Sequence, residues 1–338
     1  MKKFLWWLLP LVAILLLGAS CLIYAVNAKI HIPSEEQSLF IYPNTTNKEI
    51  TSEIKSQNVE FNNMAFRICA ALFKVKKFPC GHYTIKKGMK VSLLVDIISK
   101  GKQTPVKLII GRARLKEDLA KTINKYTALS EEDLLIAMNN NAFLNSFGVD
   151  TLSLYSLFVP NTYEVYWNLS IEELFQRMNK EQKRFWEKRQ QRLDSISLTK
   201  QDVITLASII EEETNKNDEK PLIASVYINR LKKNMKLQAD PTIKYALQDF
   251  TIRRIYNNML QTPSPYNTYL NYGLPPSPIC LPSIASIDAV LNYKNTPYIY
   301  FCAKDDFSGY HNFASSLQEH YKNARKYHKA LNKLKEKK

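Results

Sequence analysis

Three consecutive glutamates, Glu211 to Glu213, close the otherwise apolar run LASIIEEET (206–214). Adjacent like charges repel one another, so this placement calls for a physical reason. A carboxyl group against apolar neighbours loses hydration, which favours its neutral form and raises its pKa. A carboxyl that is neutral near pH 7 can act as a general acid and protonate a leaving oxygen. The run is therefore either the solvated end of a helix or the position of a catalytic acid.

A helix must carry these side chains. Thr199 and Asp202 have the spacing of a capping box, which predicts a helix beginning near Lys200. At about 100° per residue, one face of that helix is apolar. The predicted apolar face consists of Val203, Leu206, Ala207 and Ile210.

The same geometry separates the three carboxylates. Glu212 points away from the apolar face, beside Thr205 and Ser208, and is predicted to be solvated. Glu211 and Glu213 lie on opposite flanks, each stacked on apolar residues. We expect both flanking groups to have a raised pKa, and helix position alone leaves them as equal candidates for the acid.

The N-terminal segment bears on the compartment. Lys2 and Lys3 precede 23 uncharged residues, Phe4–Val26. That length spans a bilayer and exceeds the apolar region of a cleaved signal. We predict a retained single-pass helix over 4–26, with residues 1–3 in the cytoplasm and the catalytic domain on the outer, periplasmic side of the cytoplasmic membrane.

The chain is strongly basic, with a net charge of +16. Such a charge is typical of nucleic-acid binding, but an exported domain does not meet nucleic acid, so we predict none as a partner. A basic, soluble surface explains the charge. Attraction to anionic lipid head groups or to an acidic wall polymer is the sharper alternative.

Pattern along the chain predicts an α+β protein. A strand, a turn and a helix recur over 38–57, 81–102 and 105–124, and a further helix is expected over 62–74. The short strands should pair, with helices covering one face. The predicted parts are a linker (27–37), a small α/β module (38–104), a connecting strand–helix and helical region (105–198), a mixed helical and β catalytic domain (199–330) and a basic tail (331–338).

Five motifs occur in a fixed order through the C-terminal half: ASIIEEET (207–214), ASVYINRL (224–231), MKLQADPTIKYAL (235–247), SPYNTYLNYGLPPSPICLP (264–282) and PYIYFCA with HNF (297–313). Together they resemble the YceG-like (MltG-type) family of endolytic murein transglycosylases. The resemblance covers nearly all of 38–330. It implies that the N-terminal module is LysM-like, and the predicted membrane helix fits the family.

The resemblance also implies an activity, a lyase reaction at the bond between N-acetylmuramic acid and N-acetylglucosamine. It implies 1,6-anhydro ends on nascent glycan strands, termination of strand elongation, no metal and no cofactor. Peptidoglycan polymerases are implied as neighbouring partners at the membrane. By position, the catalytic acid falls on Glu211, with Glu213 in support. The residues implied to bind substrate are Asn229, Gln238, Asp240, Thr242, Tyr266, Asn267 and Tyr269.

Alternatives stay open at this point. The enzyme could be a lysozyme-like hydrolase of the same bond, or the chain could be a non-catalytic peptidoglycan-binding scaffold. Asp240 could cap a helix that has Pro241 at its first position. His311 is better explained as a structural residue than as a base. Glu164 is a distant candidate for the cleft.

Overall fold

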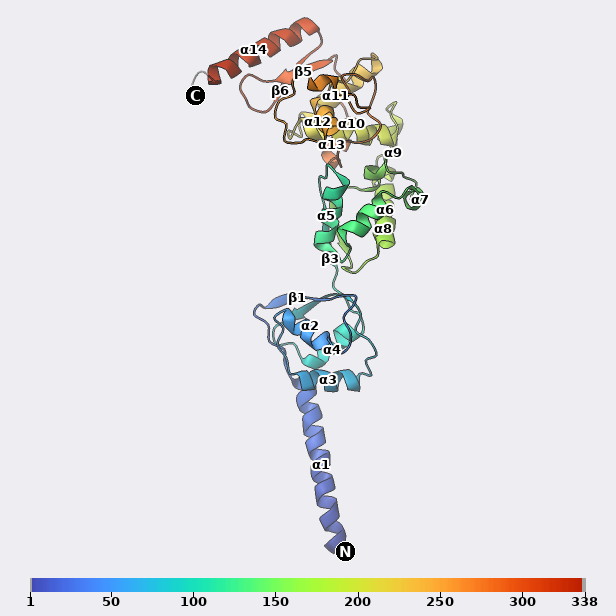
Figure 1. Cartoon of the computed structure of the whole chain (residues 1–338), viewed down its shortest axis with the longest axis vertical. Coiled ribbons are helices and arrows are strands. Elements are labelled where there is room, and N and C mark those ends of the chain that lie inside the picture. The colour runs from blue at the N-terminus through green and yellow to red at the C-terminus, as the bar shows by residue number, and fades with distance from the viewer. Residues whose placement is uncertain (1, 336–338) are drawn as a thin grey trace. The chain divides into compact units, whose positions relative to one another are not determined.

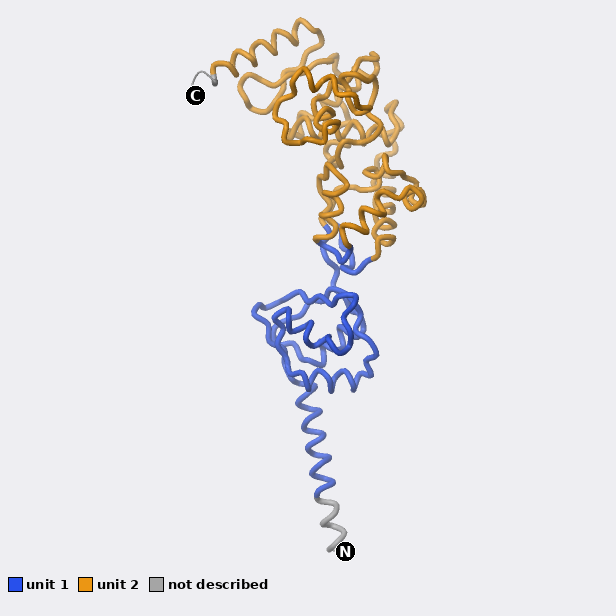
Figure 2. Tube along the Cα trace, viewed as in Figure 1, with its two compact units in different colours: residues 1–108, 126–129, 163–169 blue, residues 109–125, 130–162, 170–338 orange. Residues whose placement is uncertain are grey.

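The computed structural model describes residues 2–335, and Figure 1 shows its helices and strands. The chain forms two compact units, coloured separately in Figure 2. The first contains residues up to 108 together with 126–129 and 163–169. The second contains 109–125, 130–162 and the chain from 170 onward. The predicted boundary between 198 and 199 therefore lies inside one unit, because the helices before and after it share a core.

The chain opens with one long apolar helix, α1 (Lys2–Asn27). By length and composition, its segment Pro10–Asn27 is able to cross a membrane. Within the described residues it is the one helix that meets this test. Helix α1 contains the whole of the predicted span, 4–26.

The first unit is built on an antiparallel strand pair. β1 runs against β2, with Leu39 opposite Tyr83 at the centre of the pair. Both side chains are fully buried. The strands pair and helices pack against them, as the sequence predicted. The elements are β1 (Glu36–Ile41), α2 (Ile50–Ser56), α3 (Asn63–Leu72), β2 (Gly81–Lys86) and α4 (Val91–Ser99).

The segment 27–37 is part of this unit's core and does not behave as the linker that we predicted. Ile30 and Ile32 are buried. The Ile30 amide donates to the Met89 carbonyl at 2.8 Å, and His31 pairs with Glu60 in a β-bridge. Two isoleucines spaced by one residue put their side chains on the same side of an extended chain, where they fill the core.

The rest of the chain is mainly helical. β3 pairs with β4 and does not join β1 and β2; β5 pairs with β6. The predicted strand–turn–helix over 105–124 is present as β3 and α5. Residues 331–335 of the predicted basic tail continue α14, and 336–338 lie outside the described residues. The elements are β3 (Val106–Ile110), α5 (Lys116–Tyr126), α6 (Glu131–Met138), α7 (Asn141–Asn145), η1 (Leu154–Leu157), β4 (Asn161–Val165), α8 (Ile171–Glu187), α9 (Gln190–Asp194), α10 (Lys200–Glu213), α11 (Lys220–Lys232), α12 (Asp240–Leu247), η2 (Met259–Gln261), α13 (Ile284–Leu291), β5 (Tyr300–Ala303), β6 (His311–Ala314) and α14 (Leu317–Lys335).

Helix α10 lies at the centre of the second unit. It contacts η1, α11, α12 and α13. The predicted capping box is present: the Thr199 hydroxyl accepts from the Asp202 amide, and the Asp202 carboxylate accepts from the Thr199 amide at 2.9 Å. Every residue of 203–210 is buried, so burial extends around α10 and is not confined to the predicted apolar face. Ser208, which lies away from the predicted apolar face, is buried as well and accepts from the Ile279 amide.

This cap gives the first prediction. Replacing Thr199 with Ala removes the hydroxyl that satisfies an otherwise unpaired amide, and should lower the free energy of unfolding by about 1 kcal/mol. Urea unfolding followed by circular dichroism measures the change. Thr199→Ser keeps the hydroxyl and should stay near wild type. Equal losses in the two variants would mean that the cap is not what stabilises the start of α10.

Candidate active site

The three glutamates at the end of α10 occupy three different environments. Glu212 was predicted to be solvated, but its side chain is only 10% exposed. Its carboxylate accepts from Arg112 Nε at 2.9 Å and from Arg114 Nη2 at 3.0 Å. Burial opposes its charge, but the two guanidinium groups hold the pKa of Glu212 below its usual value. The prediction that Glu212 is solvated is thus wrong, because two arginines from the segment after β3 cover its carboxylate.

Glu211 is held as an anion. One of its carboxylate oxygens, Oε2, accepts from Lys220 Nζ at 3.0 Å, Ser283 Oγ at 2.5 Å and Ser286 Oγ at 2.6 Å. Burial alone would raise its pKa, but the donors from Ser283, Ser286 and Lys220 together lower it. The predicted rise in pKa is therefore wrong for Glu211.

Glu213 has the property that a general acid needs. Its side chain is partly exposed, and its Oε1 accepts from the Tyr227 hydroxyl at 2.6 Å. Burial is the main cause that raises the pKa of Glu213 to about 7, and the nearby Asp240 raises it further. The hydrogen bond from Tyr227 acts in the opposite direction. The expected rise in pKa is confirmed at this flank, so Glu213 keeps its proton to a higher pH than an ordinary glutamate.

Polar side chains from separate elements lie near Glu213 or near its neighbour Tyr227. Asp240 begins α12 and accepts from the Tyr269 hydroxyl at 2.5 Å. Gln238 lies two residues earlier, is exposed, and accepts from Arg230 Nη1 through its side-chain oxygen at 3.1 Å. Asp240 is exposed as well. Two residues implied to bind substrate, Asp240 and Tyr269, therefore lie close enough to Glu213 for their charges to interact, and Asp240 is open to solvent.

The remaining implied residues mainly make internal bonds. Asn229 donates its amide to the carbonyls of Thr296 and Tyr298 and so ties α11 to the chain before β5. Thr242 is fully buried and donates to the Ala239 carbonyl.

Two of these residues organise the loop 262–282. Asn267 is fully buried, and its amide donates to the Leu260 and Thr262 carbonyls. The Tyr266 hydroxyl bonds to Ser277 Oγ at 2.6 Å. These contacts shape the loop that presents Tyr269.

Asp240, His311 and Glu164 are also placed by the structure. Asp240 does not cap α12: the helix begins at Asp240, and its N-cap is Ala239, without a side-chain bond. His311 donates its amide to the buried Glu219 and bonds the same carboxylate through Nδ1, which is a structural arrangement. Glu164 is exposed on β4.

One residue of the candidate site was not singled out from the sequence. Tyr227 of the ASVYINRL motif is almost fully buried on α11 and directs its hydroxyl at Glu213. A tyrosine within a buried helix has to place its hydroxyl on a partner. That need, together with the position of Tyr227 in a motif that follows the glutamates, was the available signal.

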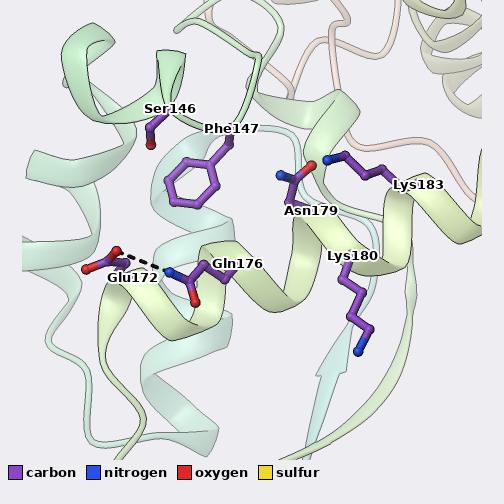
Figure 3. Close-up of a pocket in the computed structure, with 7 residues that line it drawn as sticks. All are labelled: Ser146, Phe147, Glu172, Gln176, Asn179, Lys180 and Lys183. Carbon is purple, nitrogen blue, oxygen red and sulfur yellow. Dashed lines mark hydrogen bonds between the residues drawn. The ribbon is translucent and has the colours of Figure 1, made fainter.

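A separate hollow of about 450 Å³ lies along α8 (Figure 3). Its lining includes Phe147, Lys180 and Lys183, and Gln176 donates to Glu172 across one turn at 3.1 Å. None of the residues singled out from the sequence lines this hollow. Within residues 2–335, no group of three His, Cys, Asp or Glu side chains has the geometry of a metal site.

Comparison with known proteins defines the family. The YceG-like family matches residues 39–326. The chain belongs to the YceG-like family. A crystal structure of a yceG-like protein from Listeria monocytogenes superposes with a TM-score of 0.58 at 28% identity, covering 85% of this chain and 98% of that one.

Two curated relatives carry the name endolytic murein transglycosylase. The Bacillus subtilis protein is 28% identical over 294 residues, which are 82% of this chain and 81% of the relative. The Streptococcus pneumoniae protein (strain D39) is 26% identical over 306 residues. Those residues are 82% of this chain but 55% of the pneumococcal protein, so this YceG-like chain spans about half of that relative.

The second prediction concerns the Glu211–Lys220 pair, whose side chains are 11% and 4% exposed. Glu211→Leu leaves a buried ammonium group without its partner, which should cost about 3–5 kcal/mol of unfolding free energy. The loss should be smaller in Glu211→Leu/Lys220→Met, because no charge is then left unpaired. Chemical denaturation of wild type, Glu211→Leu, Lys220→Met and the double variant measures the coupling between the two side chains. Additive losses would contradict a stabilising pair.

Because the folded-state pKa of Glu211 is lowered, the pair's contribution is present above the unfolded value of 4.5 and is lost as pH falls through the folded value. The wild-type advantage over the double variant should therefore shrink in acid.

Proposed function

We propose that this YceG-like protein is a membrane-anchored murein transglycosylase, with Glu213 as its proton donor. The observation that carries the proposal is the state of Glu213: it is partly exposed, bonded to Tyr227 and has a pKa of about 7. The substrate class comes from the names of the relatives, which act on murein. A proton donor beside exposed polar groups is what cleavage of a glycosidic bond requires.

The reaction can be written with Glu213 alone as acid and base. The neutral carboxyl gives its proton to the oxygen that links N-acetylmuramic acid to N-acetylglucosamine, and the bond from that oxygen to the muramic C1 breaks. The 6-hydroxyl of the same muramic residue attacks C1, and its proton passes to the Glu213 carboxylate. The product ends in a 1,6-anhydro ring, and the enzyme regains its starting protonation state.

A second carboxylate is unnecessary in this scheme. Glycosidases that form a covalent intermediate or activate a water need two carboxyl groups. Here the attacking oxygen belongs to the substrate and is already close, which lowers the entropic cost of the step. Tyr227 fixes Oε1 of Glu213, so Oε2 is the oxygen that carries the transferred proton. Asp240, Tyr269 and Gln238 are the groups we assign to sugar hydroxyls and acetamido arms.

Glu211 receives a different role from the one that the motif implied. Its carboxylate is ionised and saturated by Lys220, Ser283 and Ser286, so it has no proton to give. We assign it as a positioning residue that ties α10 to the start of α13. Asn229, Thr242 and Asn267 shape the site in the same way, through the backbone carbonyls that they bond.

We further propose that α1 is retained as an anchor. Its last turn is built into the first unit: Ala25 is fully buried, and Ser92 donates its hydroxyl to the Val26 carbonyl at 2.7 Å. Removal of α1 by a cut within or after this turn would therefore remove core contacts of the folded unit. The lysines at positions 2 and 3 favour a cytoplasmic N-terminus, which places the second unit outside the membrane.

An anchored site would act near the membrane, where glycan strands are polymerised, and this geometry suits cleavage within a strand. The β1–α2–α3–β2 unit is our candidate for the LysM-like module that would hold the glycan. Polymerases acting on the same strands would be its neighbours.

The third prediction tests the acid. Glu213→Gln cannot donate a proton, and should reduce cleavage of polymerised glycan by about 10²–10⁴-fold while the protein stays folded. Mass spectrometry of the digest measures the products, and the anhydro end is lighter by one water than a reducing end. Glu164→Gln, at an exposed position on β4, is the matched control and should cleave as wild type does.

Glu211→Gln separates the two glutamates. It should lower stability, with the folded fraction cleaving within about tenfold of wild type. Loss of cleavage in folded Glu211→Gln, with activity kept in Glu213→Gln, would return the acid to Glu211. Reducing ends in place of anhydro ends would favour the hydrolase, and unchanged glycan-chain length in cells carrying Glu213→Gln would favour the scaffold.

The fourth prediction follows from the pKa of Glu213. The active form is protonated, so cleavage should fall as pH rises through about 7. Tyr227→Phe removes the hydrogen bond that stabilises the anion, which raises the pKa. The alkaline limb of the pH–rate profile should therefore move to higher pH in this variant. An unmoved limb would show that another group controls it.

A further inference from the structure

Helix α3 leaves an apolar face open to solvent. It packs against α1 and α4, and it lies at the end of the first unit where α1 joins (Figure 1). Met64 is 66% exposed and Leu72 is 48% exposed, and Phe73, which follows the helix, is also exposed. A cluster of large exposed apolar side chains on one short helix is informative, because scattered single ones are the normal case.

Among its charged residues, the stretch of sequence that contains α3 carries basic residues only. No Asp or Glu occurs between Glu60 and Asp96. The basic residues in this stretch include one within α3 and three just after it. They are Arg67, Lys74, Lys76, Lys77, Lys86, Lys87 and Lys90.

The position of α3 relative to α1 is fixed by bonds within the unit. The Cys69 thiol of α3 donates to the Ala25 carbonyl at 3.6 Å. Lys90, the N-cap of α4, donates its ammonium group to Asn27 at 2.8 Å. The open face of α3 therefore stays beside the last turn of α1. If α1 spans a bilayer, as proposed above, that turn lies where the acyl chains give way to head groups.

We infer that α3 is an interfacial helix. Its open face contacts the anionic lipid surface of the membrane that α1 crosses. Met64 and Leu72 lie among the acyl chains, and the basic residues face the lipid phosphates. Burial of apolar side chains and attraction of Lys and Arg to anionic lipids are the two sources of such binding. The inference rests on the proposed anchor, and it adds a second membrane contact that holds the first unit against the surface.

The fifth prediction uses the full chain in vesicles of phosphatidylcholine with and without phosphatidylglycerol. A benzophenone-bearing amino acid is placed at position 64 or 72, and at position 42 as a control. Tyr42 is 51% exposed and follows β1, which Figure 1 draws on the side of the unit away from α1. Irradiation should crosslink lipid at least tenfold more at 64 and 72 than at 42. Equal yields at the three positions would overturn the inference.

Two further arms complete the test. Replacing Lys74, Lys76 and Lys77 with Gln should reduce the lipid crosslinks severalfold in vesicles with phosphatidylglycerol and leave them little changed in phosphatidylcholine alone; the same yields in both lipids would overturn the charge argument. Flotation of the vesicles reports α1 independently. A chain that fails to float contradicts the anchor, whereas one that floats without crosslinks at 64 and 72 contradicts only the interfacial helix.

Discussion

The charge of each carboxylate at the end of α10 is decided by the donors that reach it. Three like charges in a row would repel if they were left in a low-dielectric environment. Arg112 and Arg114 neutralise Glu212, and Lys220 neutralises Glu211. Glu213 has a neutral donor, the Tyr227 hydroxyl, and Asp240 nearby. The proton is therefore retained most easily at Glu213, and the two ion pairs make that selectivity possible.

The ion pairs have a second consequence, because each joins α10 to a different part of the second unit. Arg112 and Arg114 come from the segment after β3, and Lys220 begins α11. Ser283, which also bonds Glu211, is the N-cap of α13. The end of α10 is thus held from several directions, which keeps the side chains of its three glutamates in one geometry.

Local patterns predicted the elements well. The capping box at Thr199 fixed the start of α10, and the change from period two to period 3.6 located β1, β2, β3 and the helices that follow each of them. The pairing of β3 with β4 was missed, since partner choice depends on contacts far apart in sequence. The segment 27–37 was misjudged for a related reason: two isoleucines among polar residues give little signal until the core they enter is known.

The site was predicted only in part, and for a physical reason. A helical wheel gives the direction of a side chain but not what lies opposite, so Glu212 was predicted to be solvated, although two arginines from residues 112–114 cover it. The motif placed the two flanking glutamates correctly in the chain, and the wheel predicted lost hydration for both. Lost hydration raises a pKa only when it is not compensated, and at Glu211 the hydroxyls of Ser283 and Ser286 compensate it together with Lys220. Which flanking carboxyl keeps its proton to higher pH is therefore set by groups distant in sequence, namely Lys220 at the start of α11 and two serines at the start of α13.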